Sequence, residues 1–363
     1  MKILEIEASD GWGGQEKRIL EGALWMRDQG HQVVFGLEPE ALLNSRAEAA
    51  GFPIQHFSFR RRFWWKTFWQ LAHFLLKERF DVVATHSSLD AWIGGIVAKI
   101  CRKKVVRTRH VSTPIKSGCN SWCLYNLLAD RTITTCEEIV PKIQLQAKLP
   151  PERCLSIPTG LAPDTMRTDP KETKSWRARF SIKETDFVVG TACVMRSWKG
   201  IEDLIEAAHL LGKDPTIKFL LIGGGNWAHY AKKAAEYGLE KTVFFTGHLE
   251  VPFSAMDLCD AFVLLSTANE GVSQALLQAA FLQKPLIATS IGGSPEVCLP
   301  GKTGILVPPK SPPLVQEAII KMQKSPEWRE MLGKNGKALV LQSFTKAVMG
   351  ERIEKVYESL FTK

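Results

Sequence analysis

An acid and an amide placed eight residues apart are the most informative side chains in this sequence. Glu270 precedes Gly271 on what the sequence predicts to be a tight turn, and Gln278 lies on the helix expected to follow. On one helix this spacing amounts to about two turns, roughly 12 Å along the axis. Such a pair can hold the two ends of an extended ligand, while the helix N-terminus offers N–H groups to an anion. A nucleotide-sugar, with its sugar, diphosphate and ribose, has this shape.

Two cationic side chains supply complementary charge. Arg196 and Lys199 follow the strand expected at 187–191 after a short loop. A guanidinium binds a phosphate bidentately and an ammonium acts as a point charge, so the pair suits a diphosphate whose negative charge grows as a bond breaks. The alternative interpretation is a basic pair solvated at the start of a helix.

Short apolar runs alternate with helical periodicity in both halves of the chain, which indicates parallel sheets with right-handed crossovers. Strands are expected at 3–6, 32–35, 81–84, 105–108, 132–135, 154–157, 187–191, 217–222, 243–245 and 261–265, and helices at 15–28, 202–211, 230–237 and 344–361. The polar stretch 163–173 is interpreted as a linker. Because glycine turns follow several strands, we expect one composite site at the carboxyl ends of the strands, between two domains.

Composition narrows the class of protein. A chain of 363 residues favours two domains, and 45% hydrophobic with 23% charged residues is typical of soluble proteins. Acids near the start argue against a signal peptide, and no run of 18 apolar residues predicts a membrane span. Eight cysteines without a Cys-x-x-Cys pair indicate reduced thiols in the cytoplasm. The net charge of +9 fits nucleic acid, anionic lipid or a phosphorylated substrate.

The order of the motifs carries a family resemblance. A Gly-Gly loop, Arg-x-x-Lys-Gly, Gly-Gly-Gly, Glu-Gly and Gly-Gly-x-Pro-Glu, in this order, resemble the retaining glycosyltransferases of family 4, also called group 1. The spellings at 196–200 and 269–279 are similar to enzymes of bacterial lipopolysaccharide or surface-polysaccharide assembly. The resemblance implies the α/β GT-B fold, with two Rossmann-like, doubly wound parallel-sheet domains facing a central cleft. It implies an acceptor domain at 1–165, a donor domain at 166–343, and a C-terminal helix at 344–363 that packs back toward the first domain.

The resemblance also assigns roles to the candidate residues. Glu270 would contact donor-sugar hydroxyls and stabilise positive character at the anomeric carbon. Lys199 and Arg196 would neutralise the departing diphosphate without a metal ion or other cofactor, in agreement with the lack of an Asp-x-Asp motif. Gln278 stands where the family typically has a ribose-binding acid; it keeps an acceptor and loses the charge. For Glu270 the competing interpretation is a helix-capping acid.

Further contacts follow from the same resemblance. His110 matches a histidine beside the donor sugar, although a structural role is equally compatible with a lone histidine. Glu16 and His86 are predicted to face the acceptor, and Glu296 the ribose or base. The other predicted donor contacts are Gly13, Gly14, Gly223, Gly224, Gly271, Val272 and Ser273. Retention fits internal return, in which the leaving phosphate oxygen takes the acceptor's proton and no side-chain base is needed.

A basic and aromatic stretch precedes the helical pattern near residue 70. Aromatic residues flanked by cations are typical of a helix that lies in a headgroup layer. On a helix Leu71 and Leu75 are expected to face the core. Membrane contact is predicted for Arg60, Arg61, Arg62, Trp64 and Trp65, with a second basic cluster at Lys99, Arg102, Lys103 and Lys104.

The predicted function is transfer of a sugar from a nucleotide-sugar, with UDP favoured by family frequency, to a lipid-linked or phosphorylated saccharide. The enzyme is expected in the cytoplasm, peripheral on the anionic inner face of the plasma membrane. One alternative is a GT-B enzyme that acts on the nucleotide-sugar itself, such as an epimerase; another is a non-catalytic glycosyltransferase-like module. A nucleic-acid partner is not expected, because the cations cluster beside tryptophans rather than along a recognition helix.

Overall fold

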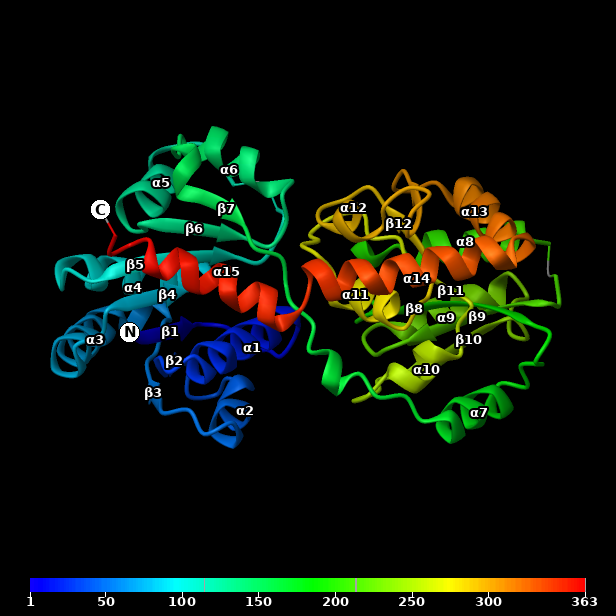
Figure 1. Ribbon diagram of the computed structural model, residues 1–363, viewed down its shortest axis with the longest axis horizontal. Helices are drawn as coiled ribbons and strands as arrows, with labels where there is room; N and C mark the ends of the chain where they lie inside the picture. The colour runs from blue at the N-terminus through cyan, green and yellow to red at the C-terminus, as the bar shows by residue number, and fades with distance from the viewer. Residues whose placement is uncertain (114, 213, 363) are drawn as a thin grey trace. The chain divides into compact units, whose positions relative to one another are not determined.

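Two compact units make up the chain (Figure 1). The computed structural model describes residues 1–113, 115–212 and 214–362; Lys363, the last residue of the predicted C-terminal segment, lies outside them. Unit 1 comprises Met1–Gly160 and Lys346–Lys363, and unit 2 comprises Leu161–Thr345.

Unit 1 is built on a seven-stranded parallel sheet of order β3-β2-β1-β4-β5-β6-β7. The strand order reverses between β1 and β4, as in a doubly wound fold. The strands are β1 Lys2–Glu7, β2 Gln32–Leu37, β3 Ile54–His56, β4 Val82–Thr85, β5 Lys104–Arg109, β6 Arg131–Thr134 and β7 Cys154–Ser156. The helices are α1 Gly14–Asp28, α2 Leu43–Ala49, α3 Trp64–Glu78, α4 Ser88–Ile100, α5 Cys119–Trp122, α6 Ile139–Ala147 and α15 Lys346–Glu358, with short helical turns η1 Arg61–Phe63, η2 Cys123–Leu127 and η3 Pro151–Arg153.

Helices cover both faces of this sheet. On one face α1 and α15 pack together, with Ile19 and Ile353 in a core that includes Ile3. On the other face α3 and α4 bury Leu71 and Val97. Strands buried on both faces need continuous apolar runs, which is why the short apolar segments of the sequence are strands.

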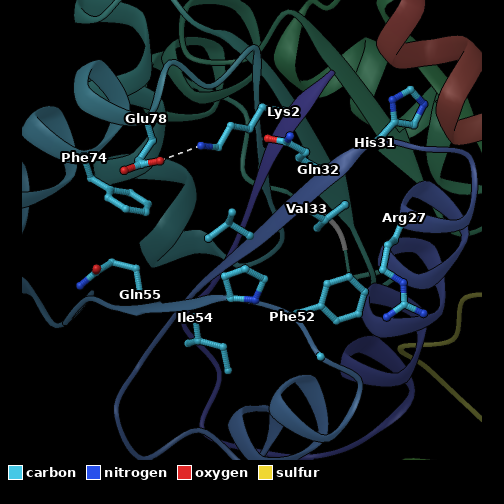
Figure 2. A pocket seen from close by; sticks show the side chains of 13 residues that line it. Lys2, Arg27, His31, Gln32, Val33, Phe52, Ile54, Gln55, Phe74 and Glu78 are labelled. Carbon is cyan, nitrogen blue, oxygen red and sulfur yellow. Dashed lines mark hydrogen bonds and ion pairs between the residues drawn. The ribbon is translucent and has the colours of Figure 1, made fainter.

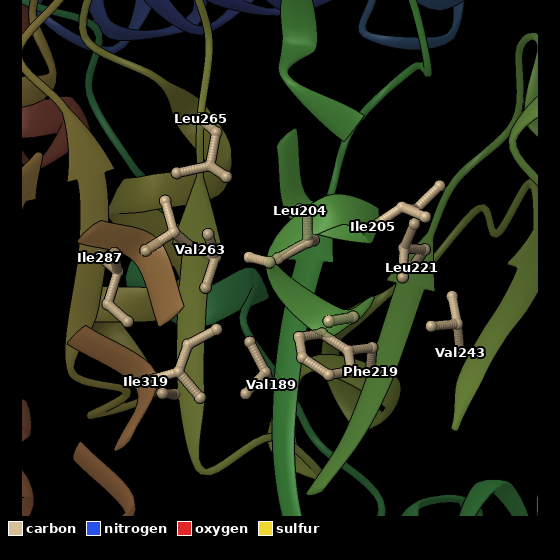
Figure 3. Close-up of a cluster of buried hydrophobic side chains, with 14 of the residues drawn as sticks. Val189, Leu204, Ile205, Phe219, Leu221, Val243, Val263, Leu265, Ile287 and Ile319 are labelled. Atoms are coloured by element: carbon tan, nitrogen blue, oxygen red, sulfur yellow. The ribbon is translucent and has the colours of Figure 1, made fainter. Parts of the chain in front are cut away.

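Unit 2 repeats the design with a six-stranded parallel sheet of order β10-β9-β8-β11-β12-β13. Its strands are β8 Phe187–Ala192, β9 Ile217–Ile222, β10 Val243–Gly247, β11 Ala261–Leu264, β12 Leu286–Thr289 and β13 Gly304–Val307. Its helices are α7 Pro170–Arg179, α8 Ile201–Leu210, α9 Trp227–Glu236, α10 Phe253–Asp257, α11 Gln274–Phe281, α12 Ser294–Val297, α13 Pro312–Lys324 and α14 Pro326–Ser343, with short turns η4 Pro163–Thr165 and η5 Ser197–Lys199. Figure 3 shows Val189, Val263 and Ile287 of adjacent strands beside Leu204 of α8 and Ile319 of α13.

The predicted α/β class with two doubly wound parallel sheets is confirmed. The interpretation of 163–173 as a linker is corrected at its end. Pro170 starts α7, and Asp169 caps that helix by accepting the N–H of Lys171 at 2.9 Å. Proline at the first helical position and an aspartate before it are helix-start signals.

Candidate functional site

The loops after β8 and β11 are bound to each other at the carboxyl end of the unit 2 sheet. The N–H of Thr267 donates to the carbonyl oxygen of Trp198 at 2.8 Å. β8 and β11 are neighbouring strands, so residues beyond their ends are brought side by side.

The glycine turn after β12 presses against the turn that carries Glu270. Gly292 has φ +59°, and a Cβ there would lie 2.0 Å from the carbonyl oxygen of Glu270. A Cβ on Gly293 would lie 2.4 Å from the backbone nitrogen of Val272. Both glycines therefore let two backbones approach closely and hold the Glu270 turn in place. Glu296 follows on α12 and is partly exposed.

Lys199 and Glu270 form an ion pair between Nζ and Oε1, although 71 positions separate them in sequence. The Glu270 side chain is 7% exposed and that of Lys199 is 19% exposed. The hydroxyl of Ser266 also donates to Oε1 of Glu270, at 2.6 Å, and the Ser266 carbonyl accepts the Thr289 hydroxyl at 2.5 Å. An ammonium and a carboxylate are thus held together in a water-poor setting at the strand ends.

Arg196 lies on the same loop as Lys199 but takes a different position. It is exposed, and its guanidinium lies over the Trp198 ring, 5.3 Å from the centroid. This cation–π contact holds the side chain at the surface. The structure therefore brings Lys199, and not Arg196, into contact with Glu270.

The predicted geometry of Gln278 is wrong. α11 starts only at Gln274, with Ser273 as its N-cap in extended conformation, so one helical turn rather than two separates Glu270 from Gln278. Asn269 has φ +61°, and the chain from Glu270 to Ser273 remains outside the helix. Gly271 and Val272 likewise precede α11 instead of forming its first turn.

The turn after β9 contacts the loop after β8. Gly223 has φ +129°, and a Cβ there would lie 2.0 Å from the carbonyl oxygen of Cys193. The N–H of Met195 donates to the carbonyl oxygen of Gly224 at 2.9 Å. Glycine at 223 is thus required by packing within the protein.

Cys193 is a neighbour of the Lys199–Glu270 pair that sequence reasoning missed. Burial raises the pKa of its thiol to about 11, with Lys199 lowering and Glu270 raising that pKa. The thiol stays protonated near neutral pH and is a poor nucleophile. Among the signals in the sequence, only its position directly after β8 points to this place.

In unit 1, Gly13 and Gly14 open α1 after β1. The Gly13 N–H donates to Oε2 of Glu16 at 2.8 Å, and Glu16 is buried. Glu16 therefore closes the first helical turn, as a capping acid does. A Cβ on Gly14 would meet nothing within 4 Å, so the protein's own packing does not require glycine there.

His86 and His110 follow β4 and β5, and the structure brings them together. His86 Nδ1 lies 3.1 Å from His110 Nε2, and His86 Nε2 lies 2.6 Å from Oε2 of Glu5. His86 is buried and His110 is partly exposed. Both ring nitrogens of His86 have protein partners, so His86 is the inner member of the pair and His110 is the member that a ligand can reach.

Glu7, at the end of β1, and Asp90, in the first turn of α4, are buried acids that the sequence analysis did not identify. Burial, followed by the charge of Asp90, raises the pKa of Glu7 well above its usual value. The Glu7 carboxyl accepts the Ser9 N–H at 2.8 Å and the Gln15 amide at 2.5 Å. These contacts close the loop between β1 and α1.

The basic stretch 60–62 of unit 1 is exposed, and α3 begins just after it. Arg60, Arg61 and Arg62 are all exposed. Arg60 lies 3.7 Å from Asp10 and 3.6 Å from Glu40, too exposed for these contacts to hold it firmly.

The tryptophans exposed on α3 are not the predicted pair Trp64 and Trp65. Trp64 donates from Nε1 to the Phe59 carbonyl oxygen at 2.7 Å and packs against the core, so it is not part of the exposed surface. Trp65, Trp69 and Leu76 are 72%, 70% and 61% exposed. At 100° per residue they lie along one side of α3; we call them the α3 stripe.

Other features of the described residues lie apart from these groups. A pocket of about 530 Å³ opens at the amino ends of β1 and β2, where Lys2 pairs with Glu78 at 2.7 Å and Arg27 lies beside Phe52 (Figure 2). It contains none of the predicted site residues. No helix in the described part of the chain is both long and apolar enough to cross a membrane.

Comparisons with known proteins agree with this architecture. Residues 12–165 match the family model described as glycosyltransferase family 4, and residues 172–339 match that of glycosyl transferases group 1. An uncharacterised glycosyltransferase of Methanocaldococcus jannaschii is 27% identical over 312 residues, which cover 81% of this chain and 79% of that protein. The capsular polysaccharide biosynthesis glycosyltransferase CapM of Staphylococcus aureus is 26% identical over 177 residues, 48% of this chain and 46% of that protein. The crystal structure of Anabaena HepE in complex with UDP shares the fold, with a TM-score of 0.88 and 22% identity over 99% of this chain and 100% of that one.

Proposed function

Because the chain belongs to the group 1, family 4 glycosyltransferases, we propose that it transfers a sugar, with retention, from a nucleotide-sugar to a lipid-linked saccharide. The product would serve lipopolysaccharide or another cell-surface polysaccharide. The observation that carries this proposal is the ion pair between the partly exposed Lys199 and the buried Glu270 at the carboxyl ends of β8 and β11.

The pair can do the charge chemistry of sugar transfer. When a donor diphosphate meets the Lys199 ammonium, it gains a cation that offsets the charge growing on the leaving group. Glu270, oriented by the Ser266 hydroxyl at 2.6 Å, is then available to the sugar and to positive character at the anomeric carbon. Arg196 adds an exposed cation on the same loop, and no metal ion is required in this scheme.

The donor is proposed to be a UDP-sugar. The support is the Anabaena protein of the same fold, whose crystal structure holds UDP. Gln278, partly exposed on α11, is proposed to contact the ribose hydroxyls through its amide.

The acceptor is proposed to lie at an anionic membrane surface on the cytoplasmic side. The α3 stripe exposes two tryptophans and a leucine, flanked by Lys66 and Lys77 and preceded by three exposed arginines. Such a surface suits the boundary between headgroups and acyl chains. The capsular polysaccharide relative supports a surface glycan as the product.

A donor screen tests the proposal. Purified protein is given a panel of UDP-, GDP- and ADP-sugars, and release of nucleotide and sugar is followed with and without a chelator. We expect slow hydrolysis of one donor, insensitive to the chelator and reduced at least about 100-fold in Glu270→Ala. Glu240→Ala, an exposed acid of unit 2, is the matched control and should retain full activity.

Two results would contradict the proposal. Equal turnover by Glu270→Ala would remove Glu270 from catalysis. Isomerisation of the donor without release of nucleotide would favour the epimerase-like alternative.

A further inference from the structure

A chain of hydrogen bonds runs through unit 1 from α15 to the loop after β5. The Tyr357 hydroxyl donates to Oε1 of Glu5 at 3.3 Å. Oε2 of Glu5 lies 2.6 Å from His86 Nε2, and His86 Nδ1 lies 3.1 Å from His110 Nε2. Tyr357, Glu5 and His86 are buried, whereas His110 is partly exposed. Only the His110 end of this relay is accessible.

The buried end has no room for a sugar. Glu5, Arg18, His86 and Tyr357 line a cavity of about 20 Å³. One water molecule already needs about 10–15 Å³ on this measure. A ligand can therefore meet the relay at His110 alone.

Glu5 is the acid that bonds to the His86 ring. Its carboxylate also accepts the Tyr357 hydroxyl and faces the buried guanidinium of Arg18. Asp90, the other buried acid nearby, accepts the backbone N–H of His86 at 3.1 Å. Glu5 is therefore the acid that orients the His86 ring.

We propose that Glu5 and His86 are positioning residues that fix the proton of His110 on Nε2 and leave its Nδ1 as a hydrogen-bond acceptor. A carboxylate only accepts, so a His86 ring with one proton carries that proton on Nε2 and accepts at Nδ1. His110 must then donate from Nε2. Its remaining nitrogen can accept the proton of a hydroxyl and cannot donate to a phosphate oxygen. This inference rests on the proposed function, a sugar transfer; the group that His110 receives is then a hydroxyl of a saccharide substrate.

The acid–base behaviour of His110 points the same way. Burial, followed by His86 and Arg18, lowers the pKa of His110 well below its usual value. A histidine whose pKa is lowered keeps its neutral ring as the pH falls through the ordinary range of histidine, so the bare nitrogen persists in mildly acidic solution.

Nitrogen NMR tests the proton positions without any substrate. The full-length protein is labelled with nitrogen-15 in its histidines, and long-range spectra at neutral pH report which ring nitrogens carry protons; His110→Gln assigns the signals. We expect single protons on Nε2 in both His86 and His110. A proton on Nδ1 of His110, or two protons on either ring, would overturn the proposal.

The variant Glu5→Gln tests whether Glu5 sets the tautomers of His86 and His110. Tyr357 keeps its donated bond on the amide oxygen, so the amide nitrogen faces His86 and donates to it. The protons of His86 and His110 should then both move to Nδ1. Glu38→Gln, a buried acid of unit 1 that accepts the Phe59 N–H at 2.6 Å, is the matched control and should leave both rings unchanged.

An unchanged His110 tautomer in Glu5→Gln would refute the role of Glu5. If that variant does not fold, the wild-type spectrum still tests the proposal, because a His110 proton on Nδ1 in the wild-type protein would refute it. A transfer assay then separates this inference from the proposed function. Glu5→Gln should lower kcat/KM about tenfold, the worth of one hydrogen bond. A wild-type protein with the expected spectrum and no activity on any donor would refute the proposed function and leave the tautomer assignment standing.

Discussion

Breaking the Lys199–Glu270 pair from its two sides should have unequal costs. Lys199→Met leaves a carboxylate that is only 7% exposed, on a turn that neighbouring backbone holds in place. Glu270→Gln leaves an ammonium that is 19% exposed, on a flexible stem that can turn toward water. Removing one partner of a fully buried pair costs about 3–5 kcal/mol. The partial exposure here and the remaining Ser266 hydrogen bond reduce this to about 2–3 kcal/mol for Lys199→Met, against about 1 kcal/mol for Glu270→Gln.

Hydrogen exchange is the suitable assay, because a chain of two compact units need not unfold in one step. Exchange of peptides from β8 and β11 reports the local free energy of opening in each variant. The double variant Lys199→Met with Glu270→Gln has no unpaired charge, so it should be more stable than the sum of the single changes predicts by about 1 kcal/mol or more. Additive costs, or a larger loss in Glu270→Gln, would refute the argument that the buried carboxylate depends on the lysine.

Two further predictions concern the turn and the surface. Gly292→Ala should destabilise unit 2 by about 2 kcal/mol more than Gly301→Ala, because both glycines have positive φ but only the Cβ at 292 would strike a carbonyl oxygen. Equal hydrogen exchange of unit 2 peptides in the two variants would argue against that close approach. Replacing both Trp65 and Trp69 by serine should weaken binding to anionic vesicles at least about tenfold, whereas Trp122→Ser, at a 41% exposed site on α5, should leave it unchanged; equal sedimentation of all three proteins would exclude the α3 stripe as a membrane contact.

The meeting of Lys199 and Glu270 could be predicted from the sequence for a simple reason. Each residue follows an apolar run, and the carboxyl ends of parallel strands lie at one edge of a sheet. β8 and β11 proved to be neighbours in that sheet. The same periodicity predicted α1 within a residue of its bounds, and it failed for β3, which has three residues and two exposed side chains at the edge of the sheet.

The position of Gln278 could not be predicted in the same way. The helix beyond Glu270 starts late because the turn is packed against Gly292 and Gly293, more than twenty positions further along the chain. A helical pattern marks which side chains share a face, but it does not show where tertiary contacts keep the preceding residues extended. The predicted spacing of Glu270 and Gln278 on one helix therefore failed.

The predicted membrane contact of Trp64 was wrong for a related reason. A helical pattern alone does not show which of two neighbouring tryptophans packs against the core. Trp64 and Trp65 are adjacent on α3, so their side chains are about 100° apart around the helix axis and face different surroundings. Both are tryptophans, so residue type does not distinguish them. The Trp64 indole N–H donates to the carbonyl oxygen of Phe59, and this bond attaches Trp64 to the protein. Once Trp64 is inside, the period of the helix places Trp69 on the outer side with Trp65. The hydrogen bond to Phe59 and packing against the core together hold Trp64 inside, and they leave Trp65 and Trp69 available to a membrane. Trp64→Phe removes the hydrogen bond and keeps the packing, so it should leave vesicle binding by the exposed side of α3 unchanged; a loss as large as that of the Trp65 and Trp69 double change would contradict this argument.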